Sequence, residues 1–248
     1  MTGSAISAFP AIFTPHTMDS MFNILLGIPL FHGISYQKLS EILGKYPFNF
    51  LKYDDGQTII KAGEPCTRLA TIVSGAARTR ISSAENRVTV SQTICAPATI
   101  APEFFFGKNT FYPSSVTAIG ETGLMTIEKK DYIDIIHSDN VFLFNFLNII
   151  SVNAQQASAG VLALTSGDLR KRIAYWIVAL TSSRGKDITM ECRQRDLYAV
   201  FGVPRQSLVA ALDKMKSDGI LDYSASCIEI SSRRKLVDML DAIPFSQQ

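Results

Sequence analysis

Residues 193–221 form the stretch RQRDLYAVFGVPRQSLVAALDKMKSDGIL. Its apolar spacing predicts two short helices in succession. Gly202 stands where the chain must turn sharply, because glycine adopts a positive φ without a Cβ clash. Pro204 is expected at the first position of the second helix, where its missing N–H costs nothing. The inner faces of the two helices are predicted from Leu197, Val200, Phe201, Leu208, Ala211, Leu212 and Met215.

Two short helices joined by a tight turn predict a helix-turn-helix motif, which offers its second helix to the major groove of DNA. The start of that helix carries Arg205, Gln206 and Ser207. Arginine bonds guanine in bidentate fashion, glutamine pairs with adenine, and serine suits a phosphate or a base edge. Further cations, suited to backbone phosphates, are Arg193, Arg195, Lys214 and Lys216. The alternative interpretation is an ordinary helical hairpin with a solvated basic edge.

A heptad pattern precedes this motif. Its apolar positions follow one another at alternating spacings of four and three residues, which is typical of a helix with one apolar seam. One interpretation is a long helix lying on the rest of the chain. The favoured one is a parallel dimer helix, because alanines in mid-seam let two backbones approach closely. The seam residues are Leu143, Leu147, Ile150, Ala154, Ala157, Val161 and Leu164.

The chain before the seam shows a different residue pattern. From Phe48 to about Glu128, short runs rich in Val, Ile, Thr and Phe are separated by glycines. Short strands with frequent turn signals predict an antiparallel sandwich or roll. Before it, residues 21–46 show a helical pattern, with Ser35 as a candidate N-cap.

Composition sets the remaining limits. The chain has 248 residues, is 47% hydrophobic and carries a net charge of +2, which allows one large domain or two modest ones. Cys66, Cys95, Cys192 and Cys227 form no CxxC pair, so we expect neither a disulfide framework nor a metal site. The sequence shows neither a signal peptide nor a long apolar run, so we expect a cytoplasmic protein without a membrane segment.

From about residue 22 to 240 the chain resembles the CRP/FNR family of bacterial transcription regulators. The N-terminal resemblance lies in GIPLF (27–31) and in Gly56, Gly63-Glu64 and Gly75, at the spacings of that family's β-roll. The C-terminal resemblance lies in LRKRIAYWIVAL (169–180), the helix-turn-helix segment, and CIEISSRRKL (227–236), which looks like a winged hairpin and final helix.

The resemblance implies an α+β fold. Its parts are an N-terminal antiparallel β-roll (a double-stranded β-helix or jelly roll), a long dimerisation helix and a C-terminal winged helix-turn-helix. Carried onto this sequence, the domains are a flexible leader at 1–20, a cyclic-nucleotide-binding-like sensor at 21–138, the dimer helix at 139–166 and the DNA-binding domain at 167–248. Arg205 matches the family's base-reading arginine, whereas Gln206, Ala210 and Tyr198 depart from the family pattern.

The effector loop departs further. Cyclic-nucleotide-binding members carry a phosphate-binding cassette, and the corresponding stretch here is APEFFFGKNTFYPSS (101–115). Glu103 falls on the position of the ribose-binding glutamate and Ser114 on that of the phosphate-binding serine, but Pro113 replaces the phosphate-binding arginine. Because a guanidinium fork is the strongest anchor for such a phosphate, we expect an effector other than cAMP or cGMP.

Aromatic rings crowd the same loop, and they allow two interpretations. They fill the former nucleotide cavity, or they line an apolar small-molecule pocket in which Glu103 and Lys108 act as polar tethers. The rings belong to Phe104, Phe105, Phe106, Phe111 and Tyr112. No cofactor is expected, and the identity of the effector stays open.

The sequence therefore predicts a homodimeric regulator that binds two-fold symmetric double-stranded DNA, with RNA polymerase as a further candidate partner. The alternative is a ligand-binding signalling module whose winged helix is a protein interface without DNA binding. An enzyme is not expected, because no catalytic triad, paired-carboxylate or phosphate-loop pattern is present in the sequence.

Overall fold

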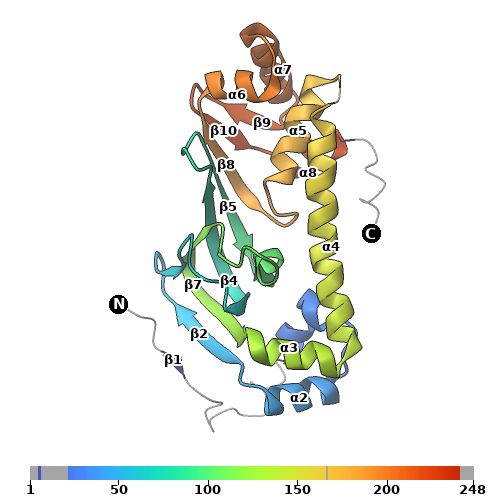
Figure 1. The fold of residues 1–248 in the computed structure, drawn as a ribbon. Coiled ribbons are helices and arrows are strands. Elements are labelled where there is room, and N and C mark those ends of the chain that lie inside the picture. Colours follow the sequence, from blue (N-terminus) through green and yellow to red (C-terminus); the bar gives the residue numbers. More distant parts are fainter. Residues whose placement is uncertain (1–4, 7–21, 166, 241–248) are drawn as a thin grey trace. The chain divides into compact units, whose positions relative to one another are not determined.

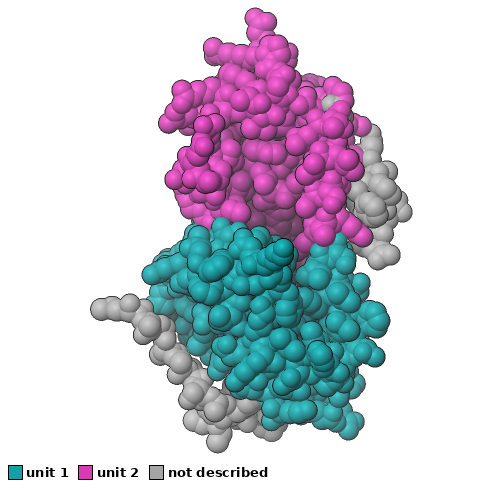
Figure 2. Space-filling model, in the orientation of Figure 1, with its two compact units in different colours: residues 1–78, 95–152 teal, residues 79–94, 153–248 magenta. Residues whose placement is uncertain are grey.

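The computed structural model describes residues 5–6, 22–165 and 167–240. The chain forms two compact units, shown in different colours in Figure 2. Unit 1 comprises Met1–Arg78 and Cys95–Val152, and unit 2 comprises Thr79–Ile94 and Asn153–Gln248. The sequence-based division instead grouped residues 79–94 with the sensor. Apart from residues 5 and 6, the leader predicted at 1–20 lies outside the described part of the chain.

Unit 1 is built on antiparallel strands, as the sequence predicts (Figure 1). The long strand β7 pairs with both β2 and β3, and β4 pairs with β6, while the short β1 extends β2. Their apolar side chains face a shared core in which Leu69, Ile72, Val116 and Leu124 are buried. The strands are β1 (Ala5–Ile6), β2 (Asn49–Tyr53), β3 (Thr58–Ile60), β4 (Arg68–Ser82), β6 (Ala98–Ile100) and β7 (Ser115–Glu128).

Gly75 marks a close approach between two of these strands. Its φ is +75°, a backbone angle that residues other than glycine rarely adopt. A Cβ atom at this position would lie 2.3 Å from the carbonyl oxygen of Glu121 in β7. Only glycine therefore fits this point of β4 without a backbone shift.

Helices precede and follow these strands along the chain. Ser35 caps α2 (Tyr36–Lys45), as predicted: its Oγ accepts a hydrogen bond from the Lys38 N–H at 3.2 Å. After β7 come α3 (Lys129–Ser138) and α4 (Asn140–Ala163). Among the described residues, no single helix has the length and apolar character to span a membrane. In this described part of the chain, α3 and α4 taken together pass that test, as a pair bent by 117°.

Unit 2 has a mixed core of helices and strands. Buried residues of this core include Ile173, Met190, Leu212, Ile228 and Leu236. β5 pairs with β8, β8 with β10 and β10 with β9, all antiparallel. The strands of unit 2 are β5 (Val88–Cys95), β8 (Lys186–Cys192), β9 (Leu221–Tyr223) and β10 (Cys227–Ile230). Its helices are α5 (Leu169–Ala179), α6 (Gln194–Phe201), α7 (Arg205–Ser217) and α8 (Arg233–Asp238). Unit 1 also contains two short 3-10 helices, η1 (Pro29–Phe31) and η2 (Pro102–Phe104).

The expected fold class is confirmed: the chain is α+β, with an antiparallel β-domain, a long central helix and a winged helix-turn-helix. The wing is the β9–β10 hairpin, in which Ile228 lies opposite Tyr223. Ser232 caps the final helix by accepting a hydrogen bond from the Lys235 N–H at 3.3 Å.

Candidate nucleic-acid interface and effector loop

The helix-turn-helix forms where the sequence predicts it. α6 ends at Gly202, whose φ of +61° places it in the left-handed region, and its N–H bonds the carbonyl of Tyr198. Two details differ from expectation. Pro204 has extended backbone angles and precedes α7 as its N-cap, so Arg205 is the first helical residue. Val200, predicted on the inner face, is 46% exposed, because the short α6 buries only its Leu197–Phe201 stripe.

The first turn of α7 presents three polar side chains to solvent. Arg205, Gln206 and Ser207 are all exposed. Within the described part of the chain, none of the three side chains makes a hydrogen bond or an ion pair. The opposite side of α7 is fixed by Leu208, Leu212 and Met215, which are fully buried. The helix is therefore held rigidly while its polar end stays available.

The flanking cations differ in how they are paired. Arg193 is exposed at the N-cap of α6, and the Arg195 Nε lies 4.0 Å from an oxygen of Asp196. Lys214 Nζ lies 2.8 Å from Asp218 Oδ1, one helical turn further on. Exposed pairs of this kind are worth about 0–1 kcal/mol, so a phosphate can displace the carboxylate at small cost.

The wing is tied to α7 by two polar contacts. The hydroxyl of Tyr223 donates to Asp213 Oδ1 at 2.6 Å, and Lys216 Nζ lies 2.6 Å from Asp222 Oδ1. The hydrogen bond to Asp213, together with smaller contributions from burial and nearby carboxylates, raises the pKa of Tyr223 to about 12. The phenol therefore keeps its proton, and with it this hydrogen bond, throughout the neutral range.

Arg172 is a residue that the sequence reasoning missed. It lies on α5, donates to the carbonyl of Phe201 at the end of α6, and places its guanidinium 5.7 Å from the centre of the Phe201 ring. Trp176 packs edge-on against the same ring, at 5.6 Å between ring centres. A cation near a helix C-terminus stabilises that end. Nothing local in the sequence links α5 to this carbonyl, because the contact spans 29 residues.

The residues of the effector loop (101–115) differ in how exposed they are. Glu103 and Lys108 are exposed, whereas Phe104 and Ser114 are half-buried. Phe105 and Tyr112 are buried in the domain, and Phe111 is 48% exposed. The Tyr112 hydroxyl donates to the carbonyl of Arg68 at 2.7 Å, which ties the loop to β4.

Phe105 belongs to an aromatic cluster that also includes α3 and α4. Its ring centre lies 5.7 Å from that of Tyr132, and the rings of Tyr132 and Phe146 are 5.5 Å apart. Lys129 Nζ lies 5.4 Å above the Phe105 ring, in a cation–π contact that the sequence reasoning did not anticipate. This packing supports the interpretation in which Phe105 fills the domain. The Tyr132 hydroxyl is buried with no partner among the described residues.

Burial also makes two cysteines poor nucleophiles. It raises the pKa of the Cys66 thiol, and it raises the pKa of Cys192 to about 12. Both therefore remain protonated thiols near neutral pH. Among the described residues, no group of three or more His, Cys, Asp and Glu side chains is arranged to hold a metal ion.

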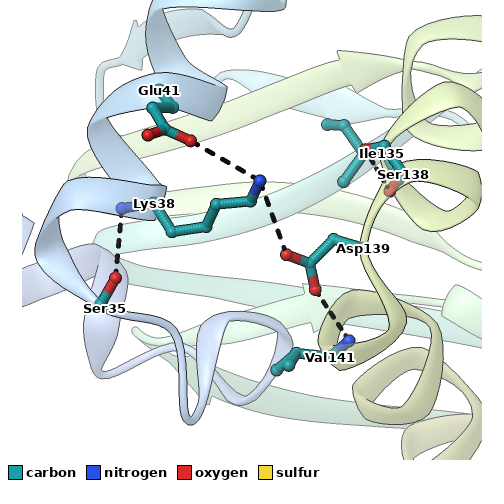
Figure 3. A network of polar contacts seen from close by, with 7 residues as sticks. All are labelled: Ser35, Lys38, Glu41, Ile135, Ser138, Asp139 and Val141. Atoms are coloured by element: carbon teal, nitrogen blue, oxygen red, sulfur yellow. Dashed lines mark hydrogen bonds and ion pairs between the residues drawn. The ribbon is translucent and has the colours of Figure 1, made fainter.

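The start of α4 is anchored by a polar network (Figure 3). Asp139 accepts a hydrogen bond from the Val141 N–H at 2.8 Å, and its other oxygen lies 3.9 Å from Lys38 Nζ. Lys38 Nζ also lies 3.6 Å from Glu41. One turn into α4, the Asn145 amide donates to the carbonyls of Leu30 and His32 at 3.0 and 2.8 Å. The helix thus begins at a fixed point on α2 and η1.

Asp139→Ala is expected to lower the free energy of unfolding by about 1 kcal/mol, because the first turn of α4 loses its side-chain acceptor. Asp139→Asn keeps that acceptor and is expected to lose less. Urea unfolding of the full chain, followed by circular dichroism, measures both. An equal loss in the two variants would mean that the Lys38 ion pair, and not the cap, provides the stabilisation.

The predicted seam lies along α4. Leu147 and Val161 are 41% and 67% exposed, and Ala154 and Ala157 are also exposed. Leu143 and Ile150 are half-buried, and Leu164 falls just past the end of α4, where it packs on the core of unit 2. Four further large apolar side chains are exposed on α4 but are not in the predicted seam: Val141 at 39%, Phe144 at 62%, Val152 at 48% and Leu162 at 71%.

Comparison with known proteins identifies similar sequences. A family model described as a cyclic nucleotide-binding domain matches residues 50–139. The Cyclic AMP receptor protein of Thermus thermophilus is 21% identical over 212 residues, which is 82% of this chain and 93% of that protein.

Solved structures are similar to this chain as well. The Catabolite Activator Protein of Thermus thermophilus has a TM-score of 0.50 at 18% identity, over 86% of this chain and 98% of that one. The sensor domain of the transcriptional regulator DNR from Pseudomonas aeruginosa has a TM-score of 0.48 at 18% identity, over 61% and 97%. The chain therefore contains a cyclic nucleotide-binding domain at residues 50–139, and over most of its length it is similar to the Cyclic AMP receptor protein of Thermus thermophilus.

Proposed function

We propose that this chain is a homodimeric, sequence-specific DNA-binding regulator whose winged helix-turn-helix reads a two-fold symmetric duplex. The observation that carries the proposal is the first turn of α7. Three polar side chains, Arg205, Gln206 and Ser207, are exposed there and unengaged within the described residues, on a helix whose other face is buried. Such an end suits base edges in a major groove.

The flanking residues have the chemistry for backbone contacts. Arg193, Arg195 and Lys214 surround the helix pair and are exposed. We assign them to phosphates, which position a protein on DNA without reading its sequence. RNA polymerase remains a candidate partner, and a cytoplasmic location is part of the same proposal.

The seam of α4 is proposed as the dimer contact. Four of its seven predicted residues, Leu147, Ala154, Ala157 and Val161, are exposed in the single chain. A second copy of α4 would cover them, and a dimer would present two α7 helices to half-sites about 34 Å apart. If α4 contacted only its own chain, as in the alternative interpretation, these apolar side chains would stay exposed to water.

The effector is proposed to be something other than cAMP, although the Thermus relative is named a cyclic AMP receptor protein. The position of the phosphate-binding arginine holds Pro113, which cannot form a charge-assisted contact. Glu103 and Lys108 are exposed and remain candidate polar tethers, and Phe104 and Ser114 are half-buried. Calorimetric titration with cAMP is expected to show no binding at ligand concentrations that saturate cAMP receptors.

DNA binding itself separates this proposal from a signalling module that binds only proteins. The full chain is expected to select a palindromic duplex from a random pool. Its affinity should fall steeply with salt, with a log–log slope of about −0.9 for each phosphate contacted. Failure to retain any duplex at low salt would favour the protein-interface alternative.

Arg205→Ala is expected to weaken binding to the selected duplex by about 1–3 kcal/mol, because a bidentate contact to guanine is lost. Arg205→Lys is the matched variant: it keeps the charge but lacks the fork, so it should retain the salt slope and still lose base discrimination. Fluorescence anisotropy over a salt series measures both quantities. Unchanged discrimination in the alanine variant would remove Arg205 from base readout.

A further inference from the structure

One strand of the DNA-binding unit comes from far away in the sequence. β5 pairs with β8 in register, with Thr89 opposite Glu191 and Val90 opposite Met190 (Figure 1). Residues 79–94, here called the hairpin, belong to unit 2, whereas the chain on either side of them belongs to unit 1 (Figure 2). The sheet under the helix-turn-helix is therefore completed by a segment that enters from the sensor and returns to it.

The hairpin is integrated into the hydrophobic core of unit 2. Val90 is 3% exposed and shares this core with Met190 and Leu197 of α6. Further along β5, the Gln92 side chain accepts a hydrogen bond from the Ser182 N–H at 2.9 Å. A Cβ atom on Gly185 would lie only 2.2 Å from the same Gln92 oxygen, so this part of the hairpin fits closely.

A bidentate ion pair joins the hairpin to the residues just before α6. The two terminal nitrogens of Arg80 lie 2.9 and 3.0 Å from the two carboxylate oxygens of Glu191. Glu191 lies near the end of β8, just before the helix pair, since Arg193 is the N-cap of α6. A cavity of about 520 Å³ lies beside this pair, lined by the hairpin tip at Glu85–Arg87 and by the start of α6.

We propose that Arg80 is a positioning residue for the DNA-reading helices, and that the hairpin carries changes in unit 1 to them. β4 runs from Arg68 in unit 1 to Ser82 in the hairpin, so a shift of its first half moves Arg80 along the chain. The ion pair and the β5–β8 ladder pass that shift to Glu191 and thus to the start of α6. This route is separate from α4. The proposal rests on the DNA-binding function proposed above.

Exchanging the charges of Arg80 and Glu191 in the full chain tests the proposed positioning role. Arg80→Glu and Glu191→Arg are each expected to weaken binding to the selected duplex about fivefold, the upper range for an exposed pair of good geometry. The double variant should recover to within about twofold of the parent. Hydrogen exchange of the amides in Lys186–Cys192 should be faster in each single variant and return to the parent rate in the double.

Glu191→Arg is the decisive variant. If charge acted only by attracting DNA, an added arginine would strengthen binding; a positioning role requires that it weaken binding. Arg87→Glu is the matched control for Arg80→Glu, because Arg87 pairs at 2.6 Å with Glu85 inside the hairpin tip and not with β8. It changes charge equally and should leave exchange in β8 unchanged.

Two failures are distinguishable. A parent protein that binds no duplex overturns the proposed function and this inference with it. A parent that binds, with Glu191→Arg binding more tightly and exchange in β8 unaltered, overturns the positioning role alone.

Discussion

Gly75→Ala is expected to lower the free energy of unfolding by about 3 kcal/mol, or to prevent folding. Two costs combine: a left-handed backbone costs a non-glycine residue about 1–2 kcal/mol, and overpacking costs about 1–3 kcal/mol. The second cost applies because the new Cβ would lie 2.3 Å from the Glu121 oxygen and 3.0 Å from the Thr122 Cα, which are backbone atoms. Urea unfolding of the full chain measures the change.

Gly56→Ala is the matched control. Gly56 has a φ of +74°, almost the same as Gly75, but no atom of the described residues lies within 4 Å of the position that its Cβ would take. Gly56→Ala should therefore lower the free energy of unfolding only by the cost of the left-handed backbone, about 1–2 kcal/mol. Equal losses in the two variants would show that the strands separate at Gly75 without cost and that the close approach does not constrain the sequence.

Ala154→Glu is expected to convert the dimer into monomers. Ala154 is exposed in the single chain, so a glutamate there leaves the monomer fold unaffected. In the proposed dimer, two carboxylates would face each other in an apolar seam, and burying them unpaired costs several kcal/mol. Sedimentation velocity should report about half the parent mass, and affinity for the full palindrome should approach that for one half-site.

Gln155→Glu supplies the control for this change. It adds the same charge on the same turn of α4, at an exposed position outside the seam. It should remain a dimer. A dimeric Ala154→Glu variant would place the contact elsewhere on the protein, and the exposed Phe144 and Leu162 would then define the next surface to test.

Local features of the fold could be predicted from the sequence. The turn at Gly202 and the cap at Ser35 depend on a few adjacent residues, so a single stretch contains the needed information. The prediction that Val200 faces inward is wrong. In a helix as short as α6, the spacing of the apolar residues is compatible with more than one buried face. Only the packing of Leu197 and Phe201 on unit 2 decides between them.

Long-range contacts could not be predicted in the same way. The Arg80–Glu191 pair joins residues 111 positions apart, and no periodicity in either segment identifies the other. The same holds for Lys129 over the Phe105 ring, where a lysine in a helical pattern looks like a solvated residue. In the effector loop, the sequence showed which rings gather but not which of them face inward. That depends on α3 and α4, which supply Tyr132 and Phe146.

The discontinuity of unit 2 along the sequence has a consequence for how the protein is synthesised and divided into fragments. During synthesis, residues 79–94 emerge well before β8, so this unit completes its core only once the last third of the chain is available. A C-terminal fragment cut at residue 153 would expose β8 as a bare edge beside an uncovered Met190, which invites aggregation. Unit 2 is thus not a separable C-terminal domain, and grafting it onto another protein requires that the graft carry its own replacement for β5.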